Sequence, residues 1–345
     1  MRVEMDSPDE DWTRAGVFEV DPGVYRIPLP LPHDGLRAVN VYAVMTEDGL
    51  VLVDSGWGVE VSREHLEKAI AGLDRDIADV RRFLVTHVHR DHYGMAIALR
   101  REYGIVVSLG EGERAAIEVL SSSAHLPLSE HVAAMERSGA TALAAMMRER
   151  MHEVHHDPAH WEAPDDWLGD RQQLVVGERT LRVVATPGHT QGHVVFRDEA
   201  AGLLFAGDHV LPHITPSIGF EAVPVELALR DYLASLRLVR EMPDVRLLPA
   251  HGPVRPSVHQ RVDELLDHHG RRLDESLAAV GTDAATAADC ANRLTWTRRR
   301  KAFADLDPFN QMLAISETAA HLDLLVAQGR LTATDHGGAR RYTVA

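Results

Sequence analysis

The segment 86–92, Thr-His-Val-His-Arg-Asp-His, holds three imidazoles and one carboxylate within six residues, at His87, His89, Asp91 and His92. Nitrogen and oxygen donors of these types are the ligands that zinc and similar divalent ions accept. The segment follows a short apolar run, so we expect a tight loop at the end of a strand. Such a loop can direct His87 and His89 at one ion and Asp91 and His92 at another. A solvated polar loop is the alternative interpretation.

Three further candidates follow apolar runs later in the chain, at His189, Asp208 and His251, and each stands beside a glycine. A strand end can aim a side chain at a shared point because the sheet behind it is rigid. Each of these residues taken alone is more typical of a hydrogen-bonded turn than of a metal site. Their value as evidence depends on the histidine-rich segment that precedes them.

The segments that must position these residues alternate between strand and helix patterns. Apolar and β-branched runs predict strands over 24–29, 39–45, 50–54, 83–85, 105–109, 173–176, 180–185, 194–197, 203–206 and 246–248. Helical periodicity predicts helices over 59–73, 94–103, 113–120, 225–240 and 256–280. Two β-rich halves separated by helices predict an α+β fold, an αββα sandwich.

The same patterns divide the chain into parts. We expect an acidic N-terminal tail over 1–16, a catalytic domain over 17–280 and a small winged-helix-like domain over 281–345, in which helices precede a short terminal strand. A helical insertion over about 121–170 interrupts the catalytic domain. It is rich in Ala and Met and holds two Trp, so we predict an apolar lid suited to an acyl or aromatic substrate.

Composition excludes several classes of protein. The 345 residues include 52 Asp and Glu against 36 Lys and Arg, a formal net charge of −16, so nucleic acid is not the expected partner. The single cysteine, Cys290, allows no intramolecular disulfide and favours a reducing, cytoplasmic setting. Neither a signal peptide nor a run long enough to span a membrane is visible, so no membrane partner is predicted. A homodimer is left open.

The order of the ligand-type residues resembles the metallo-β-lactamase superfamily, in which a His-x-His-x-Asp-His loop precedes His, Asp and His at later strand ends. The resemblance covers about residues 20–260 and includes the run 51–56, Val-Leu-Val-Asp-Ser-Gly. It implies two divalent metal ions, zinc by preference, with iron or manganese as alternatives. The implied ligands are His87, His89 and His189 for one ion, Asp91, His92 and His251 for the other, and Asp208 as the bridge.

The resemblance also implies a reaction. A hydroxide held between two metals would attack a small ester, thioester or lactone, with a small-molecule acyl compound as the substrate. Asp208 and Asp91 are the expected catalytic residues, and Asp91 would orient the nucleophile or carry its proton to the leaving group. Asp54 is interpreted as an acceptor for a ligand imidazole or as a turn cap. The predicted pocket or supporting residues are Asp54, Tyr93, His209 and His213.

Two further motifs resemble binding sites, but each is better explained by an ordinary structural role. The run 110–115, Gly-Glu-Gly-Glu-Arg-Ala, matches a dinucleotide-binding fingerprint in spacing, but its two glutamates would repel phosphate, so we predict an ordinary strand-to-helix turn. His152, His155 and His156 have helical spacing and are interpreted as a solvated or pocket-lining face.

Three alternatives to a glyoxalase II-like or lactamase-β-like hydrolase are kept. A ribonuclease is suggested by the basic run 298–301 and by the winged-helix-like tail, which resembles that of the lactamase-β-like branch. A mononuclear iron enzyme resembling the persulfide dioxygenases would use the same scaffold. A non-catalytic binding module would need neither metal.

Overall fold

The computed structural model describes residues 1–8, 10–32, 34–124, 126, 128–151 and 156–345. Contacts group these residues into two compact units, each described here by itself. The sheet unit comprises Met1–Ser122, Pro158–Pro216 and Ser235–Asp263, and the helical unit comprises Ser123–Asp157, Ser217–Ala234 and Glu264–Ala345. The domain limits and the lid expected from the sequence remain predictions.

The described part of the sheet unit holds an eight-stranded sheet and a five-stranded sheet. In the larger sheet the order in space follows the chain: β1 Val3–Met5, β2 Val17–Asp21, β3 Val24–Pro30, β4 Ala38–Thr46, β5 Gly49–Val53, β6 Val80–Val85, β7 Val106–Gly110 and β8 Asp166–Leu168. Strands β2 to β5 are antiparallel neighbours, whereas β5 to β8 are parallel. The smaller sheet has the order β13 Arg246–Pro249, β12 Leu203–Gly207, β11 Val194–Asp198, β10 Arg179–Ala185 and β9 Gln173–Val176.

Strand β5 shows why these sequences form a layered core. Its side chains alternate, so Leu50 and Leu52 join the core beneath the helices while Val51 and Val53 join the core between the two sheets. A strand buried on both faces must be apolar throughout, as Gly-Leu-Val-Leu-Val is. Burying one such side chain stabilises the fold by ~1.5–3 kcal/mol.

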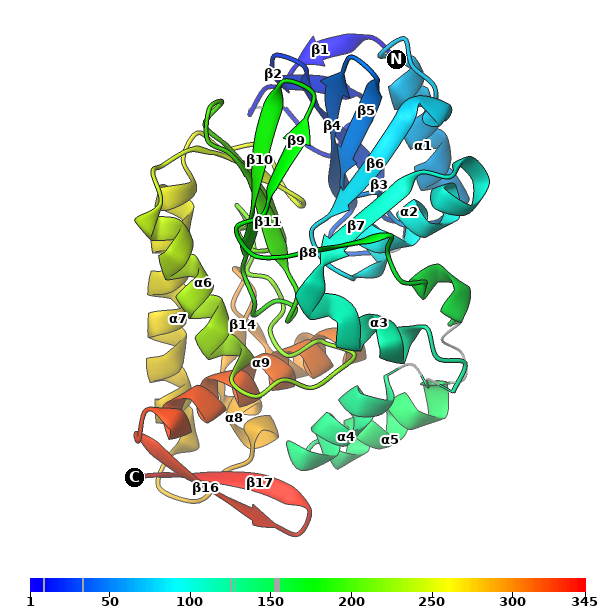
Figure 1. The fold of residues 1–345 in the computed structure, drawn as a ribbon. Coiled ribbons are helices and arrows are strands. Elements are labelled where there is room, and N and C mark those ends of the chain that lie inside the picture. Colours follow the sequence, from blue (N-terminus) through cyan, green and yellow to red (C-terminus); the bar gives the residue numbers. More distant parts are fainter. Residues whose placement is uncertain (9, 33, 125, 127, 152–155) are drawn as a thin grey trace. The chain divides into compact units, whose positions relative to one another are not determined.

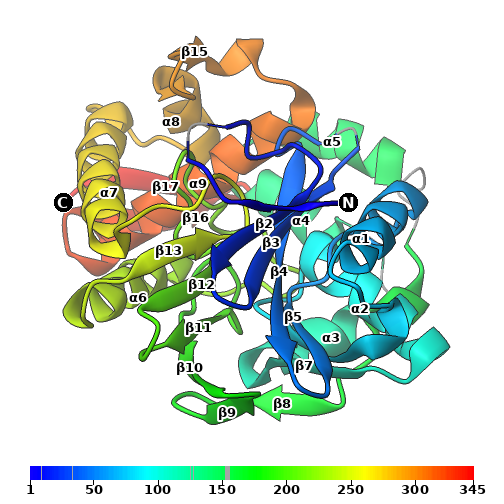
Figure 2. The ribbon, with the colours of Figure 1, turned by 90° about the horizontal axis from the view of Figure 1, so that it is seen from above.

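Helices α1 Glu60–Ala71 and α2 Arg90–Tyr103 cover the face of the larger sheet that turns away from the smaller one (Figures 1 and 2). Helix α3 Arg114–Leu120 follows β7. Helices α6 Ala228–Glu241 and α7 Val258–Val280 each run through both units. The α+β class and the sandwich of facing sheets expected from the sequence are confirmed.

Several local features differ from the prediction: β2 and β8 were not predicted, and β8 lies within the segment expected to be helical. The expected N-terminal tail contains β1, which pairs with β2, and its Asp6 forms a buried ion pair of 2.6 Å with Arg26 of β3. The exposed, three-residue β1 has too weak a pattern to be recognised in the sequence. Helix α2 begins at Arg90, so Asp91 and His92 lie in its first turn rather than in the predicted loop. An acidic side chain is favourable there because the helix N-terminus is electropositive.

The helical unit contains α4 Ser129–Arg137, α5 Thr141–Arg150, α8 Ala287–Arg293, α9 Pro308–Ala327 and the hairpin β16 Leu331–His336 with β17 Ala339–Val344. A short ribbon, β14 Thr295–Trp296 with β15 Lys301–Ala302, lies between α8 and α9 in the chain. Asp307 caps α9 by accepting hydrogen bonds from the backbone of Phe309 and Asn310. The helices precede the hairpin as expected, and the winged-helix assignment stays a prediction. His152 and His155 lie outside the described residues.

No helix among the described residues is both long and apolar enough to cross a bilayer.

A buried pair of histidines in the helical unit makes its stability depend on pH. His269 of α7 and His321 of α9 are fully buried, with Nδ1 of the first 3.2 Å from Nε2 of the second. Burial lowers the pKa of His321 to about 4 and that of His269 well below its usual value. The unfolded chain, with a histidine pKa near ~6.5, therefore binds more protons than the folded chain between about pH 4 and 6.5.

Stability should consequently fall as the pH is lowered through this range. We expect His321 alone to make the free energy of unfolding about 2 kcal/mol smaller at pH 5 than at pH 7.5, and His269 to add to this loss, as measured by urea denaturation. The double variant His269→Gln, His321→Gln should show a flatter pH dependence. His336→Gln, on the exposed hairpin, is the control and should keep the wild-type dependence. An unchanged dependence in the double variant would contradict the assignment.

Candidate metal centre

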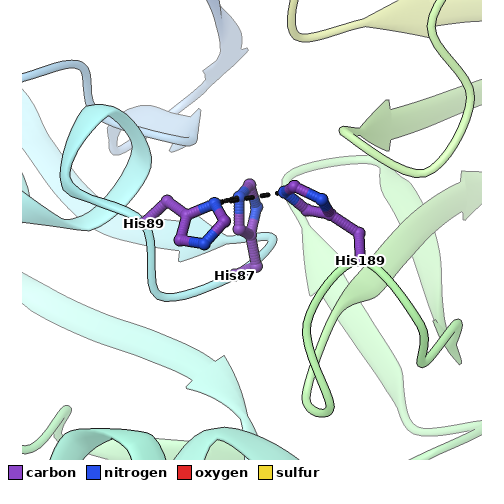
Figure 3. A group of neighbouring side chains, drawn as sticks. All are labelled: His87, His89 and His189. Carbon is purple, nitrogen blue, oxygen red and sulfur yellow. Dashed lines mark hydrogen bonds between the residues drawn. The ribbon is translucent and has the colours of Figure 1, made fainter. Parts of the chain in front are cut away.

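Three imidazoles converge where strands of the two sheets end. His87 and His89 follow β6, and His189 lies in the loop between β10 and β11 (Figure 3). The Nδ1 atom of His89 lies 3.0 Å from Nε2 of His87 and 3.1 Å from Nε2 of His189. These three nitrogens fall within 4.8 Å of one another, a spacing at which one ion could be shared.

A second group lies beside the first, formed by Asp91 and His92 of α2 with His251 beyond β13. The Oδ2 atom of Asp91 is 3.5 Å from Nε2 of His92 and 3.4 Å from Nε2 of His251. Asp208, directly after β12, is placed between the two groups. Its Oδ1 lies 3.3 Å from Nε2 of His251, and its Oδ2 lies 3.5 Å from Nε2 of His189. The structure thus brings the seven predicted ligand side chains into one cluster.

The cluster contains buried polar atoms that the protein itself leaves without hydrogen bonds. Among the described residues, Nε2 of His92, Nε2 of His251 and Oδ1 of Asp208 have no hydrogen-bond partner. A buried polar atom left unpaired costs about 1–3 kcal/mol, so such atoms seldom gather without a ligand. These nitrogen and oxygen donors suit a divalent metal ion, and the residues present therefore fit the metal that the sequence implies.

Neighbouring acceptors fix which nitrogen of each imidazole faces the cluster. The Nδ1–H of His92 donates to Oδ2 of Asp54 at 3.0 Å, and the Nδ1–H of His251 donates to the carbonyl of Ala38 at 2.8 Å. Each bond leaves the lone pair of Nε2 pointing into the cluster. Asp54 also accepts hydrogen bonds from the backbone N–H of Thr86 at 2.8 Å and from its hydroxyl. Of the two interpretations of Asp54, its contacts favour the acceptor for a ligand imidazole.

The two groups differ in their electrostatics. Burial lowers the pKa of His89 to about 3 and that of His87 well below its usual value, so these imidazoles are neutral electron-pair donors at pH 7. Burial also acts to lower the pKa of His92, but the carboxylates of Asp91, Asp54 and Asp208 outweigh it and raise that pKa to about 10. A cation bound among these carboxylates would take the place of that proton.

His193 was missed in the sequence and supports Asp208 from behind. Its Nε2 accepts a hydrogen bond from the backbone N–H of Asp208 at 3.1 Å, and its Nδ1–H donates to the hydroxyl of Thr186 at 2.9 Å. Gly207 has a φ of +49°, and a Cβ there would lie 2.7 Å from Nε2 of His193. Only glycine therefore allows β12 to end so close to this ring. The sequence offered one signal for His193: it lies four residues after His189, in the same loop.

The remaining predicted pocket residues lie around this cluster in different ways. The Tyr93 hydroxyl donates to the carbonyl of Glu162, so that hydroxyl is already engaged within the sheet unit. His209 is fully buried with its ring 6.1 Å from that of His193, and burial lowers its pKa to about 3. His213 lies beside Gly252, the residue after His251. Roles for these three in substrate binding remain predictions.

The chain has two facing sheets, helices on the outer face, and a cluster of histidines and aspartates at the strand ends. These features define the class of metal-binding αββα sandwich proteins. Residues 34–251 match the metallo-beta-lactamase superfamily, and the chain belongs to this superfamily. The family resemblance drawn from the sequence is thereby confirmed.

Known proteins similar to this chain agree with that membership. A metallo-beta-lactamase family protein from Thermus thermophilus, of known structure, is 30% identical, with a TM-score of 0.78 over 95% of this chain and 100% of its own. The probable metallo-hydrolase YqjP of Bacillus subtilis is 23% identical over 89% of this chain and 92% of its own length. An atrochrysone carboxyl ACP thioesterase of Aspergillus fumigatus is 27% identical over 73% of this chain and 47% of its own length. The chain spans about half the length of several curated relatives it matches.

Proposed function

We propose that the chain is a dinuclear metal-dependent hydrolase of a small ester, thioester or lactone. The observation that carries this proposal is the placement of the Asp208 carboxylate, with one oxygen toward His251 and the other toward His189. A carboxylate so placed can serve two ions at once. Zinc is the proposed metal because the donors are imidazole nitrogens and carboxylate oxygens, with iron and manganese as alternatives.

Metal ions bound here would supply hydroxide at neutral pH and polarise the acyl carbonyl of the substrate. The chain's own residues would hold them in the two groups already described, His87, His89 and His189 on one side and Asp91, His92 and His251 on the other. Asp54 would keep His92 in the tautomer that presents Nε2. Asp91, whose side chain is 15% exposed, would orient the attacking water and carry its proton to the leaving group.

A thioester is the first substrate class to examine, because a relative named as an acyl-carrier thioesterase matches 73% of this chain. A small-molecule acyl compound is therefore the proposed partner. The net charge of −16 disfavours nucleic acid, and the single cysteine supports a cytoplasmic location.

Metal content and turnover together test this function. Protein purified without added metal would be analysed by elemental mass spectrometry and then assayed against a panel of acyl thioesters, esters and lactones. About two zinc ions per chain together with turnover of one of these classes is the expected result. One iron per chain with oxygen consumption on a persulfide would support the dioxygenase alternative, and salt-sensitive RNA binding would support the ribonuclease. Absence of metal together with a fold unaffected by chelators would indicate a binding module.

A further inference from the structure

Glu113 is a fully buried carboxylic acid outside the metal cluster, at the end of the short 3₁₀ turn Glu111–Glu113. The hydroxyl of Thr190 donates to its Oε1 at 2.5 Å, and the backbone N–H of Val88 donates to the same oxygen at 3.3 Å. Thr190 directly follows His189, and Val88 stands between His87 and His89. One oxygen of Glu113 is therefore bonded to both of the loops that carry the three-histidine group.

The backbone around Glu113 is packed as closely as glycine allows. A Cβ on Gly110 would overlap the carbonyl oxygen of Gly192, and one on Gly112 would lie 2.8 Å from Cα of Gly192. A Cβ on Gly192 would overlap the backbone nitrogen of Glu113. Because these contacts are with backbone atoms, an added Cβ could be accommodated only if one segment moved. The Gly-x-Gly spacing that matched a dinucleotide fingerprint thus serves close packing against the loop after His189.

We propose that Glu113 is a positioning residue that holds the loop of His87 and His89 at a fixed spacing from the loop of His189, so that the three imidazoles bind one metal ion. This inference rests on the metal binding in the proposed function. The bond geometry explains why the position requires a side-chain carbonyl oxygen, because both donors bond to the same atom, Oε1. Oε1 has lone pairs for two donors, and displacing either loop would break a bond to a buried group that water cannot replace. Mutation of a residue that aligns metal ligands through such outer contacts commonly lowers the metal affinity by about 10–100-fold.

The test compares variants of Glu113 that remove or keep the oxygen atom that accepts the two hydrogen bonds. Glu113→Ala removes the acceptor, whereas Glu113→Gln keeps a carbonyl oxygen and the side-chain shape. Glu111→Ala changes an exposed carboxylate in the same turn and is the matched control. Zinc affinity would be measured by competition with a chromophoric chelator. The absorption spectrum of the cobalt-loaded full chain would report the ligand geometry, and thermal denaturation would report stability.

We expect Glu113→Ala to weaken the binding of one metal equivalent by roughly tenfold or more and to alter the cobalt spectrum. Glu113→Gln and Glu111→Ala should stay close to wild type. A lower thermal midpoint with unchanged zinc affinity and spectrum would show a merely structural role and overturn the inference. Should Glu113→Ala not fold, Thr190→Val removes the stronger of the two bonds, and unchanged metal binding in that variant would overturn the inference equally.

These readouts separate this inference from the function itself. Wild-type protein that binds metal but hydrolyses no acyl compound would refute the hydrolase and leave the Glu113 comparison valid. Wild-type protein that hydrolyses its substrate while Glu113→Ala binds metal normally would refute only the role of Glu113. A wild-type chain that binds neither zinc nor cobalt would overturn both.

Discussion

Asp208→Ala should abolish hydrolysis together with the metal binding that would depend on the Asp208 carboxylate. The carboxylate lies within 3.3–3.7 Å of His92, His189 and His251, so its removal would take from both groups the oxygen donor that the proposed function assigns to them in common. We expect kcat/KM to fall by about 10³-fold or more, since loss of even one group that stabilises developing charge costs about 10²–10³-fold. Steady-state assays and elemental analysis of the same preparation measure both effects.

The control for this variant is Asp48→Ala, which removes an exposed carboxylate from the turn between β4 and β5. It should keep the wild-type rate and metal content. Full activity in Asp208→Ala would refute the mechanism in which two bridged metals supply hydroxide. Loss of activity with unchanged metal content would instead assign Asp208 a role in catalysis without bridging.

Removal of metal from the wild-type chain should lower the rate of hydrolysis as strongly as Asp208→Ala does. Dialysis against a strong chelator should lower kcat/KM by at least about 10³-fold. Without a metal to lower its pKa, a water molecule in the site would not be deprotonated to hydroxide at neutral pH. Adding zinc to about two equivalents should restore the rate. Thermal denaturation should show a lower midpoint for the stripped protein, since a ligand that binds only the folded state stabilises it.

The fold itself should survive metal removal, because two apolar cores hold the sheet unit together independently of the cluster. Circular dichroism of the stripped protein should therefore show native secondary structure. Titration with manganese and iron in place of zinc would show which ion supports the fastest turnover. Undiminished hydrolysis by protein shown to contain no metal would rule out the metal-dependent mechanism.

The sequence by itself determined which side chains could bind metal and where most strands lie. The spacing of His87, His89, Asp91 and His92 after an apolar run placed four donors at one strand end. These signals are local, because the alternation of a strand and the polar residues at its end depend only on residues that are neighbours in the sequence. The β4–β5 hairpin was predictable for the same reason, with Gly49 directly after its turn.

Only the tertiary structure decided which residues support the cluster. Glu113 and Thr190 are 77 positions apart, and His193 reaches Asp208 across 15, so no local pattern reports either bond. The Gly-x-Gly of segment 110–112 has the same sequence whether it cradles a phosphate or packs against another backbone. The contact with Gly192 resolves this ambiguity, because close approach of two backbones is a property of the folded chain and not of either segment alone.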